Sequence, residues 1–423
     1  MNSRMRNISP QSIEQTIEEE IANLKGQWDH WAEKFSIETL GQRDERIRSE
    51  VKVLLKRVEE SELGNVAKHY ALARLRNILP EFDEKAKESI ERVLKLDPLN
   101  FDAWTLLGEQ CWRMAVEGKG DPKKPFDGMV QAKRNFEESL KKKKNVHALC
   151  NLSMLLRSYP SKNSKEKYDN LQLSVQKAKE AVSLDAESGL AWYNLGNAHL
   201  QLYILTFETE PHVKTALVSY EKAQKYGQFY NPDVHYNKAQ LEIFAEKWSD
   251  AYDSLLLSAR FDPESKRAKE RSEVLVDFCS RAALLCKNKG KMRPKRLAEL
   301  LKKCEKDAKT STDLVVVGHL THFDYIPFAF VGVDTSSEAH LVTVYNMVKG
   351  QGPLVGDIVT IPTSDMKISK SNLSLTKSQA EEEAAAIEFS SIRVERPSKL
   401  AFNKKIRGAS LEAKLFCRTE NLE

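Results

Sequence analysis

The sequence lacks the features that mark secreted, membrane-spanning or disulfide-bonded proteins. Residues 1–7 contain no apolar stretch of the kind found in a signal peptide, and a Glu-rich segment follows them. Apolar runs such as residues 314–317 are far shorter than the roughly 20 residues needed to cross a bilayer. Six cysteines occur, without regular spacing and without a Cys-x-x-Cys pair. We therefore expect a protein of the cytoplasm and nucleus, with reduced, buried thiols and no membrane partner.

Sequence motifs of the common enzyme classes are missing as well. There is no phosphate-binding GxxxxGK[ST] loop, no GxSxG nucleophile turn and no HExxH zinc motif. His319 and His322 come closest to a metal-binding pair, but no cysteine or carboxylate cluster accompanies them. The sequence thus predicts a protein that is not an enzyme, with no catalytic residue, no metal site and no cofactor. Its net charge of +5 is small for 423 residues, so overall charge does not indicate a nucleic-acid partner.

What the sequence does contain is an internal repeat. The pattern Trp-Thr-Leu-Leu-Gly at residues 104–108 returns as Trp-Tyr-Asn-Leu-Gly at residues 192–196. Both match the start of the first helix in a tetratricopeptide repeat (TPR), a unit of two helices. We expect glycine at this position because the second helix crosses the first most closely there, and a side chain would push it away.

The second helix of each repeat has its own signature. A small residue is followed by a large one four positions later and by another small one three positions after that, which places all three on one helical face. Five such triplets succeed one another: Ala86, Ile90 and Val93; Ala132, Phe136 and Ser139; Ser174, Ala178 and Ala181; Ala216, Tyr220 and Ala223; Ala251, Leu255 and Ser258. Their succession predicts an array of TPR units.

The spacing between the two signatures varies along the array. It is 12 residues from Ala239 to Ala251, as in a standard repeat, but 24 from Gly108 to Ala132. We expect the additional residues to lengthen the helices or their turns on one edge. Residues 118–122 and 160–164 are rich in Gly, Pro, Ser and Asn, which is typical of such turns.

From about residue 312 the pattern changes to short β-branched and aromatic runs. Five of them are separated by turn residues, at positions 313–320, 328–333, 340–345, 357–361 and 389–394. Five short strands fit a small Greek-key barrel of the oligonucleotide/oligosaccharide-binding (OB) type. The polar segment 378–386 between the last two is predicted to be a loose loop or a short helix. The predicted fold class is therefore α+β and multidomain, an all-α TPR superhelix followed by a small β-barrel.

We expect four segments along the chain. Residues 1–62 would form a helical leader that caps the array, and residues 63–267 the TPR array itself, because the ends of a repeat array must be shielded from water. Residues 268–311 would form a capping helix and a basic linker. Residues 312–423 would form the OB-fold domain with a flexible C-terminal tail.

Five sequence blocks, taken in order, resemble one family. They are Asn-Leu-Ser-Met-Leu-Leu-Arg at 151–157, Trp-Tyr-Asn-Leu-Gly-Asn at 192–197, Asn-Pro-Asp-Val-His at 231–235, Val-Tyr-Asn-Met-Val at 344–348 and Ser-Ser-Ile-Arg-Val-Glu at 390–395. The chain is similar to the tetratricopeptide repeat protein 5 family, stress-responsive transcription cofactors that also read nascent tubulin chains. The resemblance covers nearly the whole chain beyond the leader. Departures are Arg74, where a small residue is expected, and a longer insert near residues 370–387.

Asparagine side chains are candidates for peptide binding on the concave face of the array. One carboxamide can both donate to and accept from a peptide backbone. Asn151, Asn194, Asn197 and Asn237 fall on predicted first helices at or near groove-facing positions. The alternative is that they are helix-surface or turn residues without a ligand.

Two charged residues inside the family-like blocks are further candidates. The resemblance implies that Arg157 and Asp233 line the peptide groove. An arginine can hold a carboxylate through two parallel hydrogen bonds, and an aspartate can hold a guanidinium or an amino terminus. Nascent tubulins, the expected ligands, begin Met-Arg-Glu, so their Glu would suit Arg157 and their Arg or amine would suit Asp233. An intramolecular ion pair is the alternative.

A basic run, residues 287–296, follows the array. Such a cluster can neutralise phosphates without reading sequence. The resemblance implies contact with the ribosome through Arg293, Lys295 and Arg296. A solvated linker and a nuclear-import signal are the alternatives.

Two functions remain open at this point. In the first, the chain is a monomeric adaptor that binds the N-terminal peptide of nascent tubulin at the ribosome and, with mRNA-decay adaptor proteins, promotes tubulin mRNA decay. In the second, it is a nuclear coactivator scaffold that bridges an acetyltransferase and p53-type transcription factors and contacts DNA through the OB fold. The aromatic residues available for DNA are Phe323, Tyr325, Phe328, Phe330 and Tyr345, although strand aromatics often belong to the core.

Overall fold

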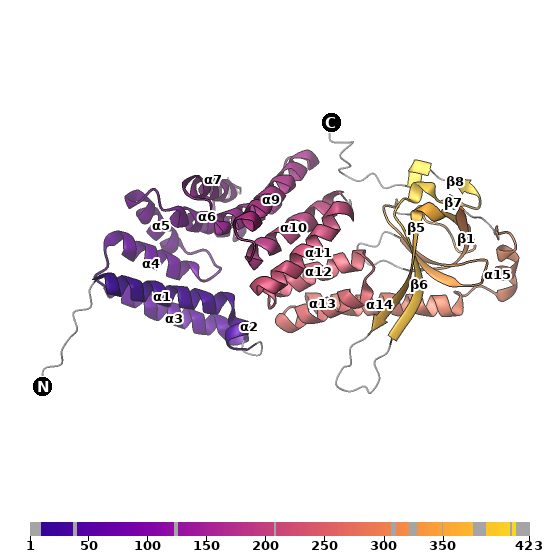
Figure 1. The fold of residues 1–423 in the computed structure, drawn as a ribbon, viewed down its shortest axis with the longest axis horizontal. Coiled ribbons are helices and arrows are strands. Elements are labelled where there is room, and N and C mark those ends of the chain that lie inside the picture. Colours follow the sequence, from indigo (N-terminus) through magenta and orange to yellow (C-terminus); the bar gives the residue numbers. More distant parts are fainter. Residues whose placement is uncertain are drawn as a thin grey trace. The chain divides into compact units, whose positions relative to one another are not determined.

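A computed structural model describes residues 10–36, 40–121, 126–206, 209–305, 310–320, 328–348, 350–374, 386–406 and 408–411. Helices come first and strands follow (Figure 1). The helices are α1 Pro10–Asp29, α2 Trp31–Lys34, α3 Leu40–Glu60, α4 Asn65–Asn77, α5 Glu84–Leu96, α6 Phe101–Val116, α7 Asp127–Lys142, α8 Val146–Ser158, α9 Ser164–Leu184, α10 Gly189–Thr206, α11 Thr209–Ala223, α12 Pro232–Phe244, α13 Trp248–Phe261, α14 Lys266–Asn288 and α15 Pro294–Leu301. None of these helices is long and apolar enough to cross a membrane.

The helices pack in pairs in the order that the repeat predicts. Within the described residues, the pairs that pack most extensively are α4 with α5, α6 with α7, α8 with α9, and α12 with α13. Every side chain of the five predicted triplets is buried. A Cβ placed on Gly108 would lie 2.5 Å from the Phe136 ring, and one on Gly196 would lie 2.6 Å from the Tyr220 ring. The large residue of the second helix therefore lies directly over the glycine of the first, which confirms the predicted reason for glycine.

The additional residues lengthen both helices and turns. Helix α9 has 21 residues and α10 has 18, whereas α12 and α13, the pair with standard spacing, have 13 and 14. Gly118 lies in the turn after α6 with φ +65°, a conformation that glycine adopts without strain. Residues 159–163 form the turn before α9.

The described chain divides into two compact units. The first consists of Met1–Tyr203 and Glu210–Tyr230, and the second of Ile204–Thr209 and Asn231–Glu423. The second unit thus contains the last helix pair, α14, α15 and all described strands. The four-segment division predicted from the sequence stays a proposal.

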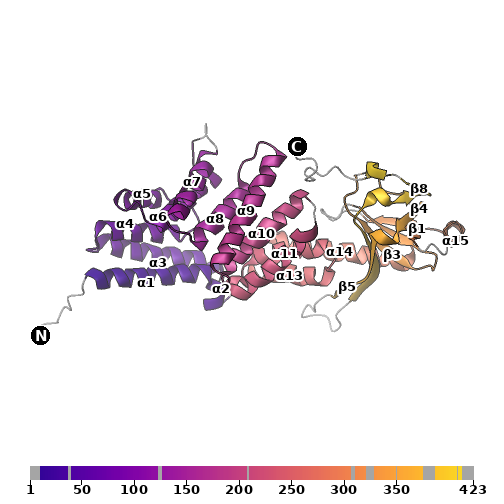
Figure 2. The same ribbon diagram turned by 45° about the horizontal axis from the view of Figure 1, so that its top comes forward.

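The N-terminal leader is a helical hairpin in the first unit. Helices α1 and α3 lie side by side and pack on α4 through a shared apolar core (Figures 1 and 2). Ile17, Ile21 and Leu24 of α1 are buried in it, as are Ile47 and Val51 of α3. The hairpin covers the open apolar side of the first repeat, which is the role expected of a cap.

The strands form one sheet that closes on itself. They are β1 Ser311–Leu320, β2 Phe328–Val333, β3 Ala339–Val344, β4 Ile358–Pro362, β5 Met366–Ser374, β6 Ala386–Val394, β7 Ala401–Phe402 and β8 Lys405–Ile406. Strand β1 pairs with β2 and β4, β2 with β3, and β3 runs parallel to β6. Strands β4 and β5 are separated by only three residues, and β5 pairs with β6. The β4–β5 segment therefore joins the two ends, β1 and β6, as in an OB-type barrel.

Five of the strands agree with the predicted runs, whereas β5 and the two-residue strands β7 and β8 were not predicted. Of these, β5 is the longest. Its side chains are mostly polar, and Ile368 on it is exposed, so the segment carried no apolar alternation. Nine residues of β5 nevertheless pair with β6. Residues 378–385 of the predicted polar insert, and the predicted tail beyond residue 411, lie outside the described residues.

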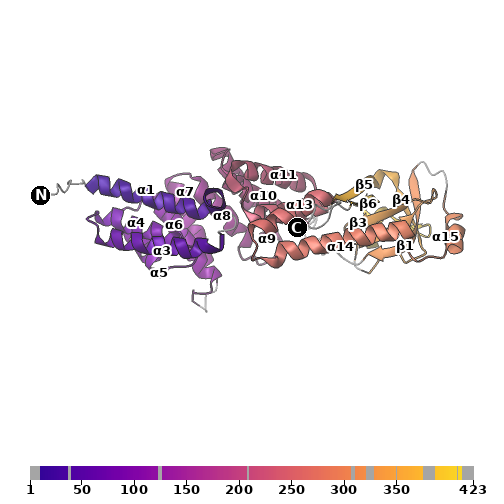
Figure 3. The ribbon, with the colours of Figure 1, turned by 90° about the horizontal axis from the view of Figure 1, so that it is seen from below.

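Helix α14 covers the outer face of the barrel. It lies along β1, β2, β3 and β6 (Figure 3), and its Leu275, Phe278 and Ala282 share one apolar core with Val315 and Val317. The intervening residues of β1 point into the barrel. Since β1 is buried on both faces, its apolar run needs no polar residue between the apolar ones.

Candidate functional site: a peptide groove and a basic surface

The first helices of the repeats line a groove in the first unit. Its volume is about 1060 Å³, and its walls come from α1, α4, α6, α8 and the start of α10. Glu109 is one of the residues that line it, and its carboxylate accepts hydrogen bonds from the amides of Asn77 (2.6 Å) and Asn151 (2.7 Å). Predicted site residue Asn151 therefore lines the groove, and its amide is held in place by a carboxylate.

Arg157 lies one turn further along α8 from Met154, which lines this groove. Its guanidinium donates to Ser153 Oγ on the same helix (3.3 Å) and to Asn194 Oδ1 on α10 (3.2 Å). Asn194 is fully buried, and its own amide donates to the Leu190 carbonyl (3.0 Å). Predicted residues Arg157 and Asn194 are thus brought together, with the asparagine orienting the arginine.

The charge of Arg157 has no acidic partner in the part of the chain that the structure describes. No Asp or Glu oxygen there lies within 4 Å of the guanidinium. Burial lowers the pKa of Arg157 to about 10, and the nearby Tyr193, Tyr220 and Cys150 offset this only in part. The group is still protonated at neutral pH. A positive charge that is partly shielded from water, and that no carboxylate of the described residues neutralises, is a favourable place for a ligand carboxylate.

Asn197, the next candidate, has a structural contact. Its Oδ1 accepts a hydrogen bond from the Tyr220 hydroxyl (2.8 Å), and only 9% of the residue is exposed. Tyr220 is the large residue that lies over Gly196. Asn197 therefore holds together the two helices of its repeat, and direct peptide contact by this residue stays a prediction.

Asp233 and Asn237 belong to the second unit and lie on α12. Asp233 is exposed and pairs with Arg267 at the start of α14 (2.6 Å), and the Arg267 guanidinium also stacks on the Tyr236 ring at 3.9 Å. Both members of this ion pair are about half exposed, so solvent weakens their attraction. The Asn237 Oδ1 accepts a long hydrogen bond from Gln240 (3.4 Å).

The basic residues Arg293, Lys295 and Arg296 gather at the start of α15. Arg293 is the residue before the helix, the other two lie in its first turn, and all three are exposed. No carboxylate of the described residues pairs with them. Positive side chains at a helix N-terminus are repelled by the positive end of the helix dipole. An anion bound there is attracted both by the helix dipole and by the basic side chains. This position fits a phosphate contact.

The barrel strands offer little free surface for stacking bases. Phe330 is fully buried in the barrel, and Phe328 packs against it and against His319. Tyr345 is 5% exposed and donates to Glu246 (3.0 Å). Phe323 and Tyr325 lie outside the described residues. Helix α14 covers the β2–β3 face, where OB folds bind oligonucleotides.

A buried polar cluster joins the last repeat to the barrel. Glu246 follows α12 and accepts hydrogen bonds from Thr343 and Tyr345 (2.5 and 3.0 Å), while Arg393 lies 3.5 Å from its carboxylate. Arg393 also donates to the Phe244 carbonyl. Burial raises the pKa of Glu246, and Arg393 acts against that shift. Two of the family-like blocks, 344–348 and 390–395, supply the barrel side of this cluster, which the sequence alone did not reveal.

Sequence reasoning also missed a group of possible metal ligands. Asp334, Glu338 and His340 come together in the β2–β3 hairpin. The histidine pair that the sequence analysis set aside is different: His319 Nε2 bonds to the Pro353 carbonyl (2.8 Å), and His322 lies outside the described residues. The signal was present as Asp-x-x-x-Glu-x-His across a turn, but it matches no standard spacing.

Together, the repeat array, its groove and the barrel define a TPR scaffold joined to an OB-fold domain. Residues 291–415 match the model described as "Tetratricopeptide repeat protein 5 OB fold domain". Tetratricopeptide repeat protein 5 of Mus musculus is 30% identical and covers 91% of each chain. The proteins of the same name from Homo sapiens and Bos taurus are each 29% identical and cover 95% and 94% of both chains. The chain belongs to the tetratricopeptide repeat protein 5 family.

Proposed function

We propose that the protein is a non-catalytic adaptor that holds the N-terminal peptide of nascent tubulin in its repeat groove at the ribosome, and so promotes decay of tubulin mRNA. The observation that carries this proposal is Arg157. It lies in one of the family-like blocks, is oriented by Asn194, and has no carboxylate partner among the described residues. The Glu of a Met-Arg-Glu terminus would supply that carboxylate.

Asp233, on α12 of the second unit, is a separate proposed contact for the Arg or amine of a Met-Arg-Glu peptide. Its present partner, Arg267, is exposed, and exposed pairs of this kind contribute only about 0–1 kcal/mol. A peptide Arg or amine can therefore replace Arg267 at low cost. Arg267 would remain on the Tyr236 ring, which it already contacts at 3.9 Å.

Arg293, Lys295 and Arg296 would dock the protein on ribosomal RNA. Their exposure and their position at the start of α15 support phosphate binding. The alternative function, a nuclear coactivator scaffold that contacts DNA through the OB fold, has weaker support, because α14 covers the strand face that OB folds use.

Stalled ribosomes that display a tubulin N-terminus test this function directly. Wild-type protein should co-sediment with them, and changing Arg293, Lys295 and Arg296 to Glu should abolish co-sedimentation while free Met-Arg-Glu peptide still binds. Each lost phosphate contact should also flatten the dependence of log affinity on log salt by about 0.7–0.9. The matched control reverses three exposed lysines, Lys141 and Lys142 at the end of α7 and Lys144 just after it, and should leave co-sedimentation unchanged.

Two results would decide against the proposal. If the protein co-sediments equally well with ribosomes that display a scrambled terminus, it does not recognise the tubulin N-terminal peptide. If the basic variant still sediments with ribosomes but no longer enters the nucleus, the run is an import signal, and the coactivator alternative becomes the better explanation.

A further inference from the structure

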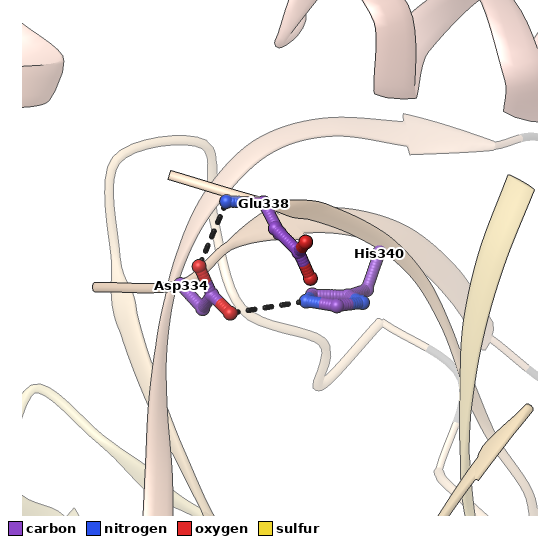
Figure 4. Close-up of side chains that lie close together, drawn as sticks. All are labelled: Asp334, Glu338 and His340. Carbon is purple, nitrogen blue, oxygen red and sulfur yellow. Dashed lines mark hydrogen bonds and ion pairs between the residues drawn. The ribbon is translucent and has the colours of Figure 1, made fainter. Parts of the chain in front are cut away.

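Three potential metal ligands lie together in the hairpin between β2 and β3 (Figure 4). Asp334 directly follows β2, Glu338 directly precedes β3, and His340 is the second residue of β3. The turn is fixed by hydrogen bonds from Glu338 N to Asp334 Oδ1 (2.8 Å) and from Asp334 N to the Glu338 carbonyl (2.9 Å). It therefore brings the three side chains toward one another, with one ligand atom of each within 4.8 Å of the others.

His340 is oriented by a residue on another strand. Its Nδ1 lies 2.7 Å from Ser390 Oγ on β6, the residue directly opposite it in the parallel β3–β6 ladder. The imidazole is buried, with 7% of the side chain exposed. Its other nitrogen, Nε2, lies 3.3 Å from Asp334 Oδ2. A metal-binding histidine is usually held in this way, through a hydrogen bond from the ring nitrogen that does not bind the metal.

Two carboxylates give this turn a negative local charge. No Lys or Arg nitrogen within the described ranges lies within 4 Å of the Asp334 or Glu338 carboxylates. The Asp334 side chain is 19% exposed, so water screens its charge only in part. Two carboxylates around a buried imidazole favour a cation at the point on which all three side chains converge.

We propose that Asp334, Glu338 and His340 form a binding site for a divalent transition-metal ion of the Zn²⁺ type. One imidazole nitrogen and two carboxylate oxygens form a donor set that suits Zn²⁺, whereas Mg²⁺ and Ca²⁺ prefer oxygen ligands alone. Three protein ligands leave at least one position for water. Because His340 is also bound to Ser390, the ion would tie the β2–β3 turn to β6 and stabilise the parallel pairing of the barrel.

Zinc binding by the purified full chain tests the proposal. Wild-type protein should bind one more equivalent of Zn²⁺ in isothermal titration than Glu338→Gln, a conservative change of an exposed side chain. Ser390→Ala should keep the site but weaken it about 10- to 100-fold, as expected for loss of a residue that orients a ligand. Glu388→Gln removes an exposed carboxylate elsewhere on β6 and should bind as wild type does.

A second readout separates this site from the thiols. With Co²⁺ in place of Zn²⁺, the wild-type spectrum should show bands of oxygen and nitrogen ligands without thiolate charge transfer. Zn²⁺ should also raise the melting temperature of the wild type and not that of Glu338→Gln. Equal stoichiometry in both proteins, or a thiolate band that persists in Glu338→Gln, would overturn the proposal.

Discussion

Replacing Arg157 by Met is expected to weaken binding of a Met-Arg-Glu peptide about 30-fold or more without unfolding the protein. The structure supplies the magnitude. Burial lowers the pKa of Arg157 to about 10, from the usual 12.5 or above, which corresponds to roughly 3 kcal/mol. Since the pKa is lower in the folded protein, holding the guanidinium in its charged form costs this free energy of folding at every pH at which the folded protein keeps it charged, including pH 7.

A bound carboxylate compensates for this cost. Truncating one partner of a buried charge pair at an interface costs about 2–5 kcal/mol, which is roughly 30-fold to several thousandfold in affinity. In the unbound protein, the variant loses hydrogen bonds to Ser153 and Asn194, worth about 1 kcal/mol each, and also loses the cost of the buried charge. These effects oppose each other, so the melting temperature should change by only a few degrees.

A double-mutant cycle gives the sharpest assay. Fluorescence anisotropy would measure four affinities, wild type and Arg157→Met, each with Met-Arg-Glu and Met-Arg-Gln peptides. If the peptide Glu pairs with Arg157, the two losses overlap and the second change adds little after the first. Arg134→Met, on an exposed position of α7, is the matched control and should bind like wild type. Fully additive losses would refute the pairing, even if each single change weakens binding.

Three further predictions concern stability. Gly108→Ala places a methyl group against the Phe136 ring and should cost about 1–3 kcal/mol in chemical denaturation, whereas Gly120→Ala, with no atom within 4 Å of the new methyl, should change little. Burial lowers the pKa of His199 to about 4, so the free energy of unfolding of the wild type should fall by up to roughly 3 kcal/mol as pH falls from 6.5 toward 4. Denaturation at several pH values should show a smaller fall for His199→Gln, and equal falls in both proteins would contradict this. Glu246→Ala removes the buried carboxylate that accepts from Thr343 and Tyr345, while Arg393 keeps Glu395 at 3.2 Å; it should cost about 1–3 kcal/mol by calorimetry, an expectation that a near-wild-type melting temperature would exclude.

The repeat part of the fold could be predicted from the sequence because its signals are local. The triplets sit within single helices, and the glycine pattern marks the crossing of neighbouring helices. Strand β5 could not be predicted in the same way, since its stability comes from pairing with β6 rather than from apolar alternation. Helix α14 was expected to cap the array, but an apolar face does not identify its partner, and the same helix also covers the barrel.

The candidate site was only partly visible in the sequence. Residue types and family-like blocks pointed to Arg157, but they could not show that no carboxylate of the described residues pairs with it, because that depends on how several helices surround it. The same limit applies to Asn197, whose carboxamide is directed at Tyr220 by the packing of its repeat. The Asp334, Glu338 and His340 group depends on a turn geometry and on Ser390, some 50 residues further along the chain.

Helix α14 sets the distance between Asp233 and the basic residues at the start of α15. Arg267 at its first turn contacts Asp233, and α15 with its basic residues begins six residues after its end. With 23 residues at 1.5 Å each, α14 spans about 34 Å. An extended peptide covers that distance with roughly ten residues. In the proposed function, the second unit would therefore set a minimum length of nascent chain for recognition. A nascent terminus could reach Asp233 only after that length had emerged beyond the ribosomal surface that Arg293 would contact.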